Sequence, residues 1–96
     1  MTNHEALLRL AVNKNDHLAV TSLRENNTEI IHTTVIRYFG TGAIAENLEI
    51  ALMKRLADHA RLYEGSEDPD VWLAHCADSE CDRLRNEAIR EKANSE

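Results

Sequence analysis

The sequence contains few proline and glycine residues, which form turns, and few cysteines, which form disulfides. Its 96 residues include one proline, three glycines and two cysteines. So few turn formers argue against a β-sandwich or barrel and favour a few helices joined by short connections. Cys76 and Cys81 lie five positions apart, which is about 140° around a helix, so we expect two reduced thiols rather than a disulfide.

Motifs for catalysis and membrane insertion are also missing. The sequence has no phosphate loop, nucleophile elbow, zinc-ligand spacing or paired-cysteine motif. No signal peptide opens it, and no apolar run approaches the ~20 residues of a membrane span. Its five histidines are scattered over all the expected helices, which favours surface positions over metal ligation. We therefore expect a cytoplasmic protein that is not an enzyme and holds no metal or cofactor.

Charge is distributed unevenly along the chain. The net charge is −6, and residues 1–40 hold four acids and four bases. The whole acidic excess therefore lies in residues 41–96, with 13 acids and seven bases. An acidic half is not the footprint of a general nucleic-acid binder and suits a basic protein partner better.

Capping signals and apolar spacing predict a compact all-α bundle of four to five helices in a single domain over 1–88, with a polar tail over 89–96 that should fray. The expected helices span 3–12, 17–25, 28–39, 43–63 and 69–88. Thr2 and Glu5 form a capping box, Asp16 or Asn15 can cap the second helix, and Thr28 can cap the third. Gly40 is placed to end a helix, and Asp68 with Pro69 is placed to start one. The β-branched residues of 28–39 also fit a strand, but their apolar spacing favours a helix.

The inward residues expected from the apolar periodicity outside 43–63 are Leu7, Leu10, Ala11, Leu18, Ala19, Ser22, Leu23, Ile31, Val35, Phe39, Leu73, Cys76, Ala77, Glu80 or Cys81, Leu84 and Ala88.

The stretch 43–63 is apolar around more than half of its circumference. One face repeats every four residues, as Ile44, Leu48, Leu52, Leu56 and Ala60, and Ile50, Met53 and Ala57 continue the apolar arc. Such a helix is either central in a bundle or keeps an apolar strip for a partner. The central position is the simpler interpretation.

Trp72 and the arginines of the last helix each have two interpretations. Trp72 is expected to plug the core against 43–63, and the alternative is a stacking surface for a base. Arg83, Arg85 and Arg90 are interleaved with acids at spacings of three and four, which is typical of a solvated helix face.

Taken in order, several segments resemble region 2, the amino-terminal domain, of the extracytoplasmic-function sigma factors. The segments that carry the resemblance are Asn15-Asp16, Ile36-Arg37-Tyr38-Phe39-Gly40, Ala45-Glu46-Asn47-Leu48 with Met53, Arg55 and Leu56, Trp72-Leu73, and Asp82-Arg83-Leu84-Arg85. The resemblance covers residues 5–86. It implies an all-α bundle that docks on the β′ clamp helices of RNA polymerase and takes part in promoter recognition at the minus-ten element.

Carried over by position, the resemblance implies two sets of site residues. The polymerase or partner set is Glu46, Asn47, Ile50, Met53, Lys54 and Arg55, and the DNA set is Trp72, His75, Arg83 and Arg85. The implied partners are the β′ subunit and promoter DNA, with an anti-sigma protein or a second copy of the chain as further partners. The chain ends where the family's linker and second domain would begin, so we expect a fragment or a shortened homologue.

The departures from the family pattern define the alternatives. Asn47, Ile50 and Ala51 stand where the family has polar Asp, Gln and Glu, which makes this face more apolar. Residues 67–85 hold six acids and two arginines, and such a surface repels phosphates. A sigma-like interaction module or homodimer without DNA binding, and an unrelated helical bundle, are therefore the alternatives.

Overall fold

Side-chain caps set the starts of the first two helices, and both match the sequence prediction. Thr2 Oγ1 accepts a hydrogen bond from the Glu5 amide at 3.2 Å, and helix α1 follows over Asn3–Val12. Asp16 Oδ1 accepts one from the Ala19 amide at 3.1 Å, and helix α2 spans His17–Asn26. The computed structural model describes residues 1–42 and 44–95 of the chain.

The β-branched segment is helical, as its spacing favoured. Helix α3 spans Thr28–Phe39 and ends at Gly40, whose φ of 75° lies in the region that glycine adopts without strain. Thr28, the predicted cap, is instead the first residue of the helix and donates its hydroxyl to the Arg24 carbonyl. Asn27 is the residue before the helix, and its buried amide donates to the Leu23 carbonyl at 2.7 Å.

The predicted helix over 43–63 is shorter in the structure. Helix α4 spans Ala45–His59, and a 3₁₀ turn, η1, follows over Ala60–Leu62. The tightening to a 3₁₀ turn is a common way for an α-helix to end. Tyr63 then leaves the helix in extended conformation and donates its hydroxyl to the Glu67 carbonyl at 3.0 Å, which ties down the loop before the last helix. Ala43, the predicted first residue, lies outside the described residues.

The last helix is longer than predicted. Helix α5 begins at Pro69 after the Asp68 cap, as expected, and continues to Ser95. Residues 89–95, the described part of the expected tail, continue α5 as helix. These residues contain no proline or glycine and are rich in Ala, Glu, Arg and Lys, which have high helix propensity. The proposed division into a domain over 1–88 and a tail thus does not coincide with a helix end.

The core is formed by one apolar stripe from each helix. The buried members include Leu7, Leu10, Leu23, Ile31, Val35, Leu52, Leu56, Ala60, Leu73, Ala77 and Cys81. Four predicted inward residues are wrong: Ala11 and Ala88 are exposed, Leu18 is 67% exposed and Ile44 is 63% exposed.

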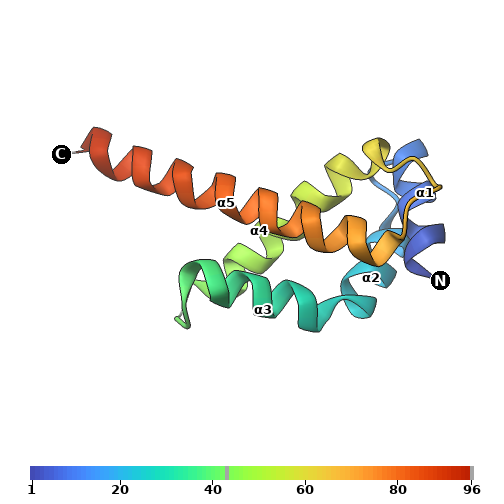
Figure 1. Cartoon of the computed structure of the whole chain (residues 1–96), viewed down its shortest axis with the longest axis horizontal. Coiled ribbons are helices and arrows are strands. Elements are labelled where there is room, and N and C mark those ends of the chain that lie inside the picture. Colours follow the sequence, from blue (N-terminus) through green and yellow to red (C-terminus); the bar gives the residue numbers. More distant parts are fainter. Residues whose placement is uncertain (43, 96) are drawn as a thin grey trace.

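Five α-helices and one 3₁₀ turn make up all the regular structure of residues 1–42 and 44–95, so the all-α prediction is confirmed. Figure 1 shows α5 running alongside α4 and α3 and then projecting past them, while α1 and α2 lie at the opposite end. The molecule is accordingly elongated, with extents of 44 × 22 × 22 Å. Helix α4 occupies the middle, with α2 on one side and α5 on another.

Candidate interaction site

Helix α4 presents two different surfaces on opposite sides of its core stripe. Ile50 and Arg55 are five residues apart, or about 140° around the helix. Ile50 faces a groove between α2 and α4, and Arg55 faces α5. We call the first surface the α2–α4 groove, whose lining includes Val20, Arg24, Ile31, Ile50, Met53 and Ala57. We call the second the Glu80 seam, formed by Arg55, His59, Glu80, Arg83 and Glu87.

The α2–α4 groove consists of two adjoining hollows with an apolar floor. Their volumes are about 320 and 450 Å³, and both are lined by Arg24, Ile50 and Met53. Met53 is only 5% exposed, so it forms the bottom of the groove, while Ile50 is 47% exposed and stands in its middle. In the groove, the half-exposed side chain of Ile50 therefore lies next to the buried side chain of Met53.

Helix α2 is the second wall of the groove, and its position follows from its own core contacts. Ala19 and Leu23 are fully buried and hold α2 against the rest of the core. Val20 and Arg24, each one position further on, then turn toward α4. Asp16 anchors the start of this wall: the Ala19 amide hydrogen bond and the Arg9 guanidinium outweigh burial and lower the pKa of its carboxyl.

Charges of opposite sign stand at the two ends of the groove. One end carries Lys14 and Lys54 with Asp58, and the other carries Glu25, Glu46 and Glu49. Glu49 is held by His32, whose Nδ1 lies 2.6 Å from Glu49 Oε1. Among the residues that the structure describes, no ion pair holds Lys14, Arg24 or Lys54, or Glu25 or Glu46. These rim charges are therefore available to a partner.

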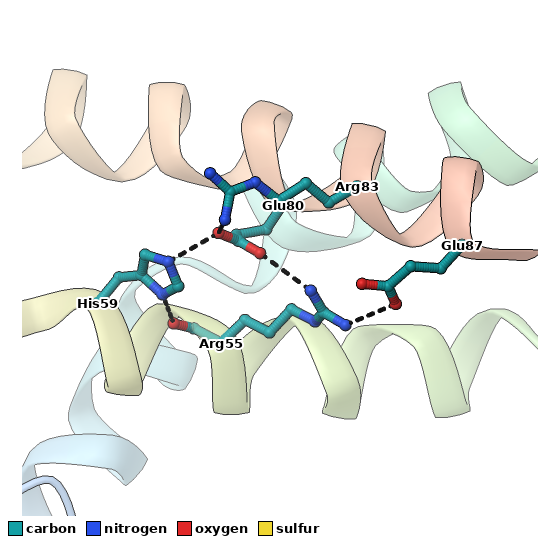
Figure 2. A network of polar contacts seen from close by, with 5 residues as sticks. All are labelled: Arg55, His59, Glu80, Arg83 and Glu87. Carbon is teal, nitrogen blue, oxygen red and sulfur yellow. Dashed lines mark hydrogen bonds and ion pairs between the residues drawn. The ribbon is translucent and has the colours of Figure 1, made fainter.

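In the Glu80 seam, by contrast, the charges satisfy one another (Figure 2). Glu80 is 2% exposed, and its two carboxylate oxygens lie 3.2 Å from Arg55 Nη1 and 2.9 Å from His59 Nε2. Arg55 also reaches Glu87 at 2.9 Å, and Arg83 approaches Glu80 at 3.6 Å. Burial lowers the pKa of Arg55, but the hydrogen bonds to both glutamates outweigh it and raise the pKa overall.

His59 completes the seam with both ring nitrogens engaged. Nδ1 lies 2.9 Å from the Arg55 carbonyl oxygen, and Nε2 lies 2.9 Å from Glu80 Oε1. His59 thus stands between the α4 backbone and the Glu80 carboxylate. The seam is a buried carboxylate contacted by Arg55 and His59 of α4 and by Arg83 of its own helix, and it joins α4 to α5.

The predicted partner residues are divided between the two surfaces. Ile50 and Met53 form the groove floor, and Glu46 and Lys54 stand at its opposite ends. Asn47 is exposed on the same helix. Arg55 does not join them, because it points into the seam (Figure 2). The structure therefore brings four of the six predicted residues together at one groove.

The predicted DNA residues are also divided. Trp72, His75 and Arg83 line one shallow hollow of about 240 Å³. Trp72 is half-buried and makes an edge-to-face contact with Tyr63, with ring centroids 5.7 Å apart. Arg85 lies elsewhere, with its guanidinium 5.0 Å from the Tyr38 ring centre and 2.9 Å from Asp82. Both arginines therefore have acidic partners within the chain.

Neither cysteine has the character of a nucleophile. Cys76 is half-buried and Cys81 is buried, and both are free thiols. Burial raises the pKa of each thiol to about 11, so both are protonated at neutral pH. Within residues 1–42 and 44–95, no cluster of three His, Cys, Asp or Glu side chains is placed to hold a metal ion.

Two features of the site were missed by the sequence interpretation. The α2 wall, with Val20 and Arg24, and Lys14 in the connection before it, could not be foreseen, because the sequence does not say which helices are neighbours. The seam had a signal: Glu80 falls on the same apolar stripe as Leu73, Ala77 and Leu84. Glu80 or Cys81 was predicted on that stripe, and both are buried; the missed feature is that Glu80 pairs there with Arg55 and His59 of α4.

The functional inference depends on these surfaces, because comparisons with known proteins found no match. No family model matches the chain, and no curated protein or solved structure matches it significantly. Across the described part of the chain, every helix is too short or too polar to cross a membrane.

Proposed function

We propose that this chain is a sigma-factor region-2-like domain that docks on the β′ clamp helices of RNA polymerase and takes part in promoter recognition. The observation that carries the proposal is the α2–α4 groove, where four of the six residues implied by the resemblance lie together. Ile50 is 47% exposed there, and covering the rest of its side chain contributes on the order of 1 kcal/mol to binding.

The promoter part of the proposal concerns side chains of helix α5. It is supported by the shared hollow of Trp72, His75 and Arg83, where the partly buried indole ring and an arginine line the same hollow. A base stacks on such a ring in proteins that bind single-stranded nucleic acid. Arg83 and Arg85, however, lie 3.6 Å from Glu80 and 2.9 Å from Asp82, and these acids offset the charge that would attract phosphates.

This pairing favours a second candidate function. A sigma-like interaction module or homodimer that has lost DNA binding needs the groove but not a basic α5. The acids of residues 67–85 are compatible with that role, since they would repel the nucleic-acid backbone.

The first experiment is binding of the full chain to a purified β′ clamp-helix fragment at two salt concentrations. We expect a dissociation constant in the low micromolar range that weakens with salt, because the groove ends are charged. Ile50→Glu should weaken binding by at least about tenfold. Ile89→Glu is the matched control, because Ile89 is 61% exposed on the projecting part of α5. A folded sample that does not bind contradicts polymerase docking.

Promoter recognition is tested separately with a single-stranded minus-ten oligonucleotide. Binding that weakens with Trp72→Ala would support the promoter role, since the indole ring supplies the stacking surface. Docking on β′ without any DNA binding would favour the interaction module instead. Sedimentation over a range of concentrations then tests the homodimer, which should bury above ~1,000 Å² in total if it is stable.

A further inference from the structure

The walls of the α2–α4 groove restrict what secondary structure can enter it. Its walls are helices: α2 and α4 along its length, and the start of α3, with Thr28 and Ile31, at the glutamate end. Apart from the end turns, the backbone amides and carbonyls of these helices are already paired within each helix. An extended segment would find few free backbone groups there with which to pair. A helix satisfies its own backbone hydrogen bonds, so it is the form of polypeptide that such a groove accommodates.

The charges around the groove restrict the occupant further. Lys14 and Lys54 flank one end, and Glu25 and Glu46 flank the other, on the two sides of Ile50. None of these four has an ion-pair partner among the described residues. Asp58 also lines the lysine end, so the two lysines leave a net positive charge there. Complementarity therefore requires acids on the occupant at the lysine end.

We propose that the α2–α4 groove binds one amphipathic α-helix of a partner protein, which places acidic side chains beside Lys14 and Lys54. Its apolar residues recur at helical spacing and pack on Ile50, Met53 and Val20. Basic side chains at its other end face Glu25 and Glu46. This inference rests on the proposed protein-docking function. It adds the charge polarity of the partner helix and the place on the chain where that helix binds.

A second copy of this chain is a poorer occupant. The projecting part of α5 is the obvious segment for such an exchange, but residues 86–96 contain Ile89 as their single large apolar residue. One apolar side chain does not form the stripe at i, i+3, i+4 and i+7 that a helix in a groove needs. Self-association through the groove is accordingly an outcome that the test below detects.

The test selects partners from a displayed library of peptides of about 18 residues, or about five helical turns, with randomised apolar and charged positions. The bait is the full chain. We expect enriched sequences with helical apolar spacing and acids grouped at one end. Enrichment without that spacing, or no enrichment at all, would overturn the proposal, as would self-association that Ile50→Glu abolishes.

Charge reversal then tests whether the partner helix binds beside Lys14 and Lys54. Lys14→Glu combined with Lys54→Glu should weaken the enriched acidic peptides by at least about tenfold, and changing the grouped acids of the peptide to lysine should restore binding. The matched control is Arg90→Glu combined with Lys92→Glu, which reverses two exposed charges near the end of α5, away from the groove. Equal weakening by both pairs would mean that only net charge matters, and the proposed seat would be wrong.

The same variants separate this inference from the polymerase proposal. If the enriched helices bind the groove and the β′ fragment does not, polymerase docking fails and the helix-binding groove stands. If the β′ fragment binds equally well to Ile50→Glu and to the unmodified chain, docking stands and the groove is not its seat.

Discussion

The two surfaces of α4 contain similar residue types, but the structure uses them in different ways. In the Glu80 seam, Arg55 and His59 lie 3.2 and 2.9 Å from a carboxylate that is 2% exposed. In the α2–α4 groove, Lys14, Lys54, Glu25 and Glu46 surround a half-exposed isoleucine and have no ion-pair partner among the described residues. The seam therefore holds the protein together, and the groove is available to another molecule.

This difference shows why a cluster of charges does not by itself identify a binding surface. When a buried ion pair loses one partner, the remaining charge is uncompensated and the folded protein is strongly destabilised. An exposed charge that is lost changes stability little, because water solvates what remains. Substitutions in the seam should therefore alter the free energy of unfolding, and substitutions in the groove should alter binding. Four experiments test this expectation.

The largest effect should come from the core stripe that lies between the two surfaces. Leu52 is fully buried, so we expect Leu52→Ala to lower the free energy of unfolding by about 2–5 kcal/mol, through lost burial and a cavity. Urea unfolding measures this. The matched control is Leu18→Ala, because Leu18 is 67% exposed and should change stability by less than about 0.5 kcal/mol. Equal losses would show that the assignment of the core is wrong.

The next effect should come from the seam. Arg55→Met leaves the buried Glu80 carboxylate with His59 and the more distant Arg83, so we expect a loss of about 3 kcal/mol in the free energy of unfolding. Replacing both partners, as Arg55→Met with Glu80→Met, should recover much of that loss, because no charge is then left buried. A double variant that is less stable than Arg55→Met alone would contradict this account of the seam.

The groove should respond in the opposite way. Ile50→Glu should change the free energy of unfolding by less than about 1 kcal/mol, because nearly half of the side chain is already in solvent. Its effect should instead appear as weaker binding of β′ or of a selected helix. Thermal unfolding beside a binding titration measures both quantities. If Ile50→Glu unfolds the protein, Ile50 belongs to the core and the groove is not a docking surface.

The smallest effect concerns the start of α2, the second wall of the groove. The pKa of Asp16 is lowered in the folded protein, so its ionised form stabilises the fold at neutral pH, and this contribution is lost as the pH falls through the lowered pKa. Asp16→Asn keeps a good helix cap but does not ionise. We expect the parent to have the higher Tm at neutral pH and the difference to disappear in acid. A difference that persists in acid would mean that charge is not the cause.

Local signals in the sequence were sufficient for much of the fold. The caps at Thr2, Asp16 and Asp68 and the stop at Gly40 are confirmed, because each depends on residues within a few positions along the chain. The errors occurred where position relative to other helices matters. Leu18 fits an apolar stripe but is 67% exposed, and α5 continues past Ala88 although residues 88–94 are exposed.

The candidate site was predictable only in part. Glu46, Ile50, Met53 and Lys54 were identified on α4 and do meet at one groove, whereas the α2 wall was not foreseen. Arg55, adjacent to Lys54 in the sequence, points to the other surface. Side chains that are neighbours in sequence point about 100° apart on a helix. The surface to which each one belongs therefore depends on which other helix it faces.

By itself, the sequence determined which segments become helices and where most of them begin, because caps, glycine and apolar spacing act over a few residues. Only the tertiary structure decided which charges are paired and which remain available. The Arg55–Glu80 pair joins residues 25 apart, and the His32–Glu49 pair joins residues 17 apart. Pairing depends on the distance between helices, and that distance is set by how the apolar stripes of all the helices pack together.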